Sequence, residues 1–132
     1  MPLVVLLAVV ENIFLSLNYA MSSVLYHEML FKRVPPFPDN FAAKFNLFKD
    51  ICVDKYKIDQ GHVKLIQDLK EIVISHKKSP VEFQRKDNFV ICDGSYRIKT
   101  ISTNDLKDSI AKAKSFILNT TTIVGRNGKM FN

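Results

Sequence analysis

The chain of 132 residues has no tryptophan, only four glycines and five prolines, and two cysteines. So little glycine and proline excludes collagen-like and low-complexity chains and argues against a glycine-rich β-sandwich. Two cysteines exclude a disulfide scaffold and a cysteine-based zinc ribbon. Apolar residues make up 47% of the chain and charged residues 24%, as in ordinary globular proteins. The length predicts one domain that buries enough surface for its own core.

Basic residues are missing from the first quarter of the sequence. Residues 1–31 contain no lysine or arginine and only two acidic residues, Glu11 and Glu28. Residues 32–132 hold all 19 basic residues and 11 of the 13 acidic ones, a balance of +8. A basic body favours anionic partners, nucleic acid first, although a well-solvated surface has the same composition.

The apolar run over residues 3–10 imitates the core of a signal peptide. It lacks a basic segment before it and a small-x-small cleavage site after it, and Glu11-Asn12 interrupts it well short of a membrane-spanning length. We therefore predict no membrane association; peripheral attachment through this run is the alternative, and the absence of flanking Lys or Arg weighs against it. We interpret Cys52 and Cys92 as free thiols, which predicts a cytoplasmic protein.

Motifs of known enzyme chemistry are absent. The sequence has no GxGxxG, GxxxxGK[ST], GxSxG or HExxH pattern. His27, His62 and His76 have no carboxylate at metal-ligand spacing. We predict neither a metal site nor a cofactor.

Hydrophobic periodicity predicts four helices, over residues 3–32, 40–56, 60–77 and 104–119. Two β-prone runs flank Asp93-Gly94-Ser95, which is a strong hairpin signal, and they predict a β-hairpin at about 89–101. The predicted fold is mainly α, an antiparallel four-helix bundle with a small β-hairpin inserted before the last helix. Residues 1–119 form its single domain and residues 120–132 a C-terminal tail.

The first predicted helix has an apolar side wider than a bundle of this size needs. Such a helix is central to a bundle or shared with a second subunit. We predict a homodimer that buries part of helix 3–32.

His76 lies four residues after Ile72 and seven after Leu69, so it projects from the buried side of its helix. Beside Lys77 and Lys78, its imidazole is pushed toward the neutral form. A neutral histidine there can take a proton from a ribose 2′-hydroxyl while a cation stabilises the phosphorane. The alternative is a structural histidine that is hydrogen-bonded near the helix end.

The helix layout, with a basic-x(n)-His element at the end of the third helix, resembles the HEPN superfamily. That resemblance covers about residues 3–118 and implies an all-α, commonly dimeric bundle. Many members are metal-independent ribonucleases, whereas others are inactive nucleotide-binding or regulatory domains. The family's signature is Arg, four to six residues, then His, and here Lys70, five residues and His76 stand in that pattern. Lysine departs from the signature because it cannot make arginine's bidentate phosphate contact, and the hairpin is not a general family feature.

Glu28 falls inside the apolar face of the first predicted helix. A buried carboxylate must be paired or neutral. Lys70 and His76 are the expected partners; otherwise Glu28 reaches solvent at the helix end.

A basic cluster surrounds the predicted hairpin, with Phe83, Phe89 and Tyr96 interleaved. The aromatic rings could stack bases, or they could seat the hairpin on the bundle. The cluster consists of Lys77, Lys78, Arg85, Lys86, Arg97 and Lys99.

Two functions follow from these features. The first is a HEPN-like domain that binds RNA or a nucleotide, in its most concrete form an endoribonuclease with His76 as general base and Lys70 as phosphate stabiliser. The alternative is a non-catalytic dimeric module that regulates or binds a partner protein, and the lysine at position 70 favours it.

Overall fold

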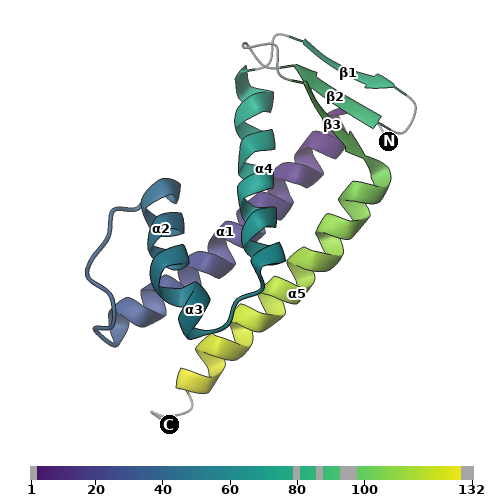
Figure 1. Ribbon diagram of the computed structural model, residues 1–132. Helices are drawn as coiled ribbons and strands as arrows, with labels where there is room; N and C mark the ends of the chain where they lie inside the picture. The colour runs from purple at the N-terminus through teal and green to yellow at the C-terminus, as the bar shows by residue number, and fades with distance from the viewer. Residues whose placement is uncertain (1–2, 79–80, 86–87, 93–97, 129–132) are drawn as a thin grey trace.

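The computed structural model describes residues 3–78, 81–85, 88–92 and 98–128 (Figure 1). The mainly α class is confirmed, with a small antiparallel sheet before the last helix. The long helices are α1 (Leu3–Leu30), α4 (Gln60–Lys78) and α5 (Thr103–Gly128). A further helical segment consists of α2 (Phe41–Leu47), the π-helical turn η1 (Phe48–Cys52) and α3 (Val53–Lys55).

Helix α1 is the centre of the packing, because α2, η1, α4 and α5 all contact it. Figure 1 shows α4 running opposite to α1 and α5, whereas α1 and α5 run in the same direction. The antiparallel arrangement therefore holds between α4 and its two long neighbours but not between α1 and α5. The largest side chains that are completely buried include Phe48 of η1 and Phe116 of α5, whose rings meet edge to face at 6.0 Å.

The segment 41–55 packs on the core through side chains at intervals of three and four residues. Phe45, Phe48 and Cys52 are buried and Phe41 is half-buried. The side chain of Asn40 accepts a hydrogen bond from the Ala43 N–H at 2.9 Å and caps the helix.

The sheet differs from the predicted hairpin by one strand. β2 (Asn88–Cys92) pairs with β3 (Ile98–Ser102) in antiparallel fashion, as predicted, and β1 (Val81–Arg85) adds a strand on the other side of β2. Ile91 and Ile101 are buried and belong to the main core. The sheet thus covers the end of the bundle where α4 ends and α5 begins (Figure 1).

Helix α5 does not end at residue 119. It continues to Gly128, so the prediction of a tail from residue 120 is wrong over residues 120–128. Thr120 and Ile123 are buried, which gives this extension a packed face. At the start of α5, Ser102 and Asp105 form a capping box: the Ser102 N–H donates to Asp105 and the Asp105 N–H donates to Ser102, both at 3.0 Å.

Candidate functional site

His76 lies on α4 near its end, with its side chain 31% exposed. Its Nε2 is 4.0 Å from Oε1 of Glu11 on α1, and the Glu11 side chain is 44% exposed. This contact places a carboxylate within reach of the imidazole. A carboxylate in this position can orient the imidazole ring.

Lys70 is directed at aromatic rings. Its Nζ lies 5.0 Å from the centre of the Phe41 ring and 5.4 Å from that of Phe14. These are cation–π contacts with α2 and α1. Lys70 and His76 thus face different partners on the neighbouring helices, and the structure does not join them as the pair that the sequence predicted.

The predicted basic cluster is spread along α4 and the sheet. Lys77 is exposed on α4. Arg85 stands on β1 opposite Asn88, and Lys99 stands on β3 opposite Ile91, so the two basic residues occupy opposite edge strands and different rows of the sheet. Lys86 and Arg97 lie outside the described residues, as do the side chains of Lys78, Arg85 and Lys99.

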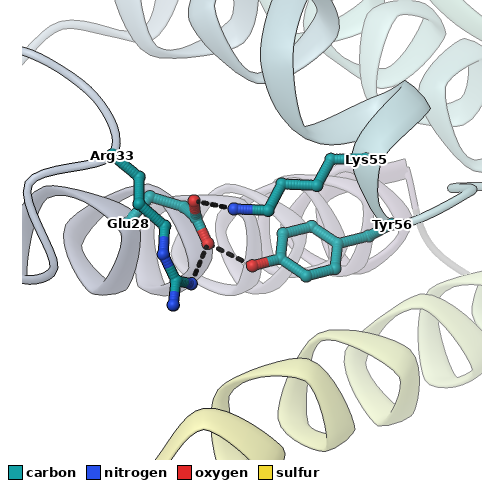
Figure 2. Close-up of polar contacts among 4 residues, drawn as sticks. All are labelled: Glu28, Arg33, Lys55 and Tyr56. Carbon is teal, nitrogen blue, oxygen red and sulfur yellow. Dashed lines mark hydrogen bonds and ion pairs between the residues drawn. The ribbon is translucent and has the colours of Figure 1, made fainter.

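Glu28 forms the most highly connected polar cluster among the described side chains, and neither predicted partner belongs to it. The carboxylate is completely buried. Lys55 Nζ donates to its Oε2 at 2.7 Å, Arg33 Nη1 donates to its Oε1 at 3.4 Å, and the Tyr56 hydroxyl donates to the same Oε1. Figure 2 shows Lys55 and Tyr56 reaching the carboxylate from the end of α3, with Arg33 coming from the segment after α1.

Two opposing effects set the ionisation of Glu28. Burial acts to raise the pKa of its carboxyl group. The hydrogen bonds from Lys55 and Tyr56, together with the charges of Lys55 and Arg33, outweigh burial and hold the pKa below its ordinary value. Burial and the negative charge of Glu28 in turn raise the pKa of the neighbouring Cys52 thiol to about 12, so this thiol is neutral.

The Glu28 cluster is built where two helices end in the same way. After α1, the N–H groups of Lys32 and Arg33 donate to the carbonyls of Met29 and Glu28 at 3.0 and 2.9 Å. This is a Schellman motif, in which Lys32 takes the left-handed conformation with φ 58°. The turn carries Arg33 back toward the Glu28 side chain.

The second motif follows α3. The N–H groups of Lys57 and Ile58 donate to the carbonyls of Asp54 and Val53 at 3.4 and 2.9 Å, and Lys57 has φ 52°. This helix end places Lys55 and Tyr56 next to α1. The sequence did not indicate Lys55 or Tyr56 as partners of Glu28, because they lie 27 and 28 positions away from it. Arg33 lies only five positions from Glu28, so its basic side chain was a partner that the sequence could have indicated.

The most exposed residues of α1 are uncharged. Glu11, whose side chain is 44% exposed, is a charged residue that lies beside them. The exposed fraction reaches 79% at Val4, 71% at Tyr19 and 73% at Leu30. One continuous stripe at intervals of three and four residues, here called the α1 stripe, consists of Val4, Ala8, Asn12, Leu15, Tyr19, Ser23, Tyr26 and Leu30.

By length and composition, residues Val4–Leu30 could also cross a membrane, a property that core helices of soluble proteins and signal sequences share. Comparison with known proteins adds no relative, since no family model, curated protein or solved structure matches the chain.

Proposed function

We propose that the protein is a non-catalytic, homodimeric interaction module and that two copies meet through the α1 stripe. The observation that carries this proposal is the absence of charge from the α1 stripe, whose residues are all exposed and extend along the whole helix. Charged residues make up 24% of the chain, so an uncharged stripe of this length departs from the composition of the rest of the protein. Depletion of charge and the presence of tyrosine are typical of the buried centre of an interface.

The geometry of the stripe suits helix–helix pairing. A helix of 28 residues is about 42 Å long at 1.5 Å per residue. Residues at intervals of three and four keep to one side of such a helix over its whole length. Tyr19 and Tyr26 present large, partly apolar rings to a partner, and Asn12 can make a polar contact that sets the register.

A charge placed in the stripe tests this proposal. We expect wild type to sediment as a dimer at micromolar concentration and Tyr19→Glu to sediment as a monomer, because an interface would bury two unpaired carboxylates. Ile74→Glu on α4, where the side chain is 39% exposed, is the matched control and should remain dimeric. A wild-type particle of 15.1 kDa would refute the proposal. Sedimentation with lipid vesicles, lost in Tyr19→Glu, would assign the stripe to a membrane instead.

A second candidate function is RNA or nucleotide binding with metal-independent cleavage, and the His76–Glu11 pair favours it. A half-exposed imidazole beside a carboxylate can act as a general base toward a ribose 2′-hydroxyl. Because the Lys70 ammonium lies over Phe14 and Phe41, the exposed Lys77 is the better placed residue for the phosphate. The resemblance to the HEPN superfamily supports the same chemistry.

The test is an RNA cleavage assay without metal. We expect His76→Ala to abolish cleavage and Glu11→Gln to reduce it, whereas Lys70→Met should retain it. RNA binding should weaken as salt rises and after charge reversal at Lys77, since phosphate contacts release counterions. No cleavage by wild type, or equal cleavage by wild type and His76→Ala, would exclude the catalytic form of this proposal.

A further inference from the structure

A groove lies between α4 and the segment formed by α2 and η1, and no residue of the α1 stripe lines it. It has a volume of about 330 Å³, and both helices line it with apolar and charged side chains. The residues that matter for its chemistry are Phe41, Phe45, Lys49, Lys70, Glu71 and Ile74.

The floor of the groove is aromatic. The rings of Phe41 and Phe45 are stacked at 5.2 Å with an interplanar angle of 20°. The Phe14 ring of α1 contacts the Phe41 ring, with the two ring centres also 5.2 Å apart. Ile74 on the α4 side is 39% exposed. The groove therefore leaves aliphatic and aromatic surface in water, and an incoming apolar side chain would gain by covering it.

A lysine stands on each wall of the groove. Lys49 Nζ lies 4.5 Å from the centre of the Phe45 ring, and Lys70 Nζ lies 5.0 Å from that of Phe41. Neither ammonium has an ion pair within the described parts of the chain, whereas Lys44, Lys55 and Lys112 each contact a carboxylate. A carboxylate that entered the groove would therefore meet two cations and one carboxylate, Glu71, without having to break an ion pair of either lysine.

The shape of the groove argues against a small ligand. The groove is a surface channel between two helices, and small-molecule sites usually bury most of their ligand. A helix that lies in the groove and points its apolar face inward matches this shape.

We propose that the α2–α4 groove docks an acidic amphipathic helix of a partner protein. Its apolar side chains pack against Phe41 and Ile74, and its flanking Asp or Glu side chains pair with Lys49 and Lys70. A second copy of this chain does not supply such a helix from the α1 stripe, since the stripe carries no carboxylate. The proposal adds a partner class to the interaction function, but it does not depend on dimerisation.

The probe is a fluorescein-labelled peptide of about 18 residues, with Leu at i, i+4 and i+7 and Glu on both flanks of this apolar face. The full chain is titrated into the peptide, and binding is measured by fluorescence polarisation. Two control peptides replace every Glu with Lys or every Leu with Ser. We expect saturable binding of the acidic Leu peptide and no saturation with either control peptide.

The double variant Lys49→Glu/Lys70→Glu should weaken binding of the acidic peptide about tenfold and allow the Lys peptide to bind. Lys107→Glu/Lys114→Glu changes the net charge by the same amount at two exposed lysines of α5, and it should change the affinity by less than about twofold. Because charge reversal at Lys70 also removes its ring contacts, thermal melting must show that the variant is folded.

Ile74→Ser provides a second, uncharged test, with Leu118→Ser on α5 as its control; the Leu118 side chain is 69% exposed. Only Ile74→Ser should weaken binding. No saturable binding to wild type, an equal loss in both charge variants or equal binding of the Ser peptide would each overturn the proposal. Repeating the titration with Tyr19→Glu separates this surface from the dimer, because the peptide should bind that variant as well as it binds wild type.

Discussion

Replacing Glu28 with glutamine removes the charge at the centre of the buried cluster while it keeps the size of the side chain. In the native protein the carboxylate accepts hydrogen bonds from Lys55, Tyr56 and Arg33. Hydrogen bonds to a charged group contribute about 1.5–3 kcal/mol each. Glutamine retains one acceptor oxygen, so we expect the loss of one strong bond and the weakening of a second, or about 2–4 kcal/mol of the free energy of unfolding.

Exposure of the two cations sets the upper limit of this loss. The side chains of Lys55 and Arg33 are 39% and 37% exposed, so both can turn into water when the carboxylate is gone. The loss should therefore stay below the roughly 5 kcal/mol that follows from stranding a fully buried charge. For a chain of this length, it corresponds to a fall in Tm of roughly 6–15 °C.

The assay is thermal and urea unfolding of wild type, Glu28→Gln, Lys55→Met and the double variant. We expect the two single changes to be coupled by at least about 0.5 kcal/mol, as for residues in contact. The matched cycle with Lys70→Met tests the partner that the sequence alone predicted, and its coupling with Glu28→Gln should be near zero. A Glu28→Gln protein as stable as wild type, or coupling with Lys70 in place of Lys55, would refute the reasoning.

The pKa of Glu28 is lower in the folded protein than its ordinary value of 4.5, so ionised Glu28 stabilises the fold at pH values above 4.5, and this stability should be lost as the pH falls through the folded pKa. Between pH 7 and pH 3, the urea midpoint should therefore fall less steeply for Glu28→Gln than for wild type. Parallel curves for the two proteins would contradict this prediction. Lys57→Gly should raise the free energy of unfolding by about 0.5–1 kcal/mol in urea titration, since glycine takes φ 52° without strain, and a loss of stability would show that the lysine side chain matters more. Asn40→Ala should lower it by about 1 kcal/mol because it removes the cap of α2, whereas an unchanged melting temperature would show that the cap is dispensable. Cys52 is buried and its thiol has a pKa of about 12, so it should resist iodoacetamide in the native protein at pH 8 and react only in denaturant. Peptide mass spectrometry measures the labelling, and rapid labelling of the native protein would disprove this burial.

Local rules accounted for most of the secondary structure. The run without glycine or internal proline produced α1, and Pro35-Pro36 keeps the segment after its Schellman motif from continuing as a helix. The capping box of Ser102 and Asp105 began α5 where its pattern placed it. These features depend on residues within one or two turns of each other, so the sequence is enough to predict them.

The two secondary-structure errors arise where packing outweighs local preference. Val81–Arg85 contains three polar or charged residues out of five and a proline just before it, so it did not resemble a strand. It becomes β1 because it pairs with β2. Residues Asn119–Thr122 have weak helix propensity, yet α5 continues through them because Thr120 and Ile123 are buried against the rest of the protein. The hydroxyl groups of Thr120, Thr121 and Thr122 donate to carbonyls of the preceding turn, so none of them is left without a partner.

The sequence alone determined that Glu28 had to be paired or neutral, because the hydrophobic period placed it among buried residues. It also showed that the first helix is apolar over most of its length, from which we predicted a second subunit. Only the tertiary structure decided which groups contact the charged side chains. Lys55 and Tyr56 reach Glu28, and Glu11 reaches His76, because separate helices pack side by side. Such contacts between residues far apart in the chain depend on the positions of whole helices relative to one another, which no short stretch of sequence specifies.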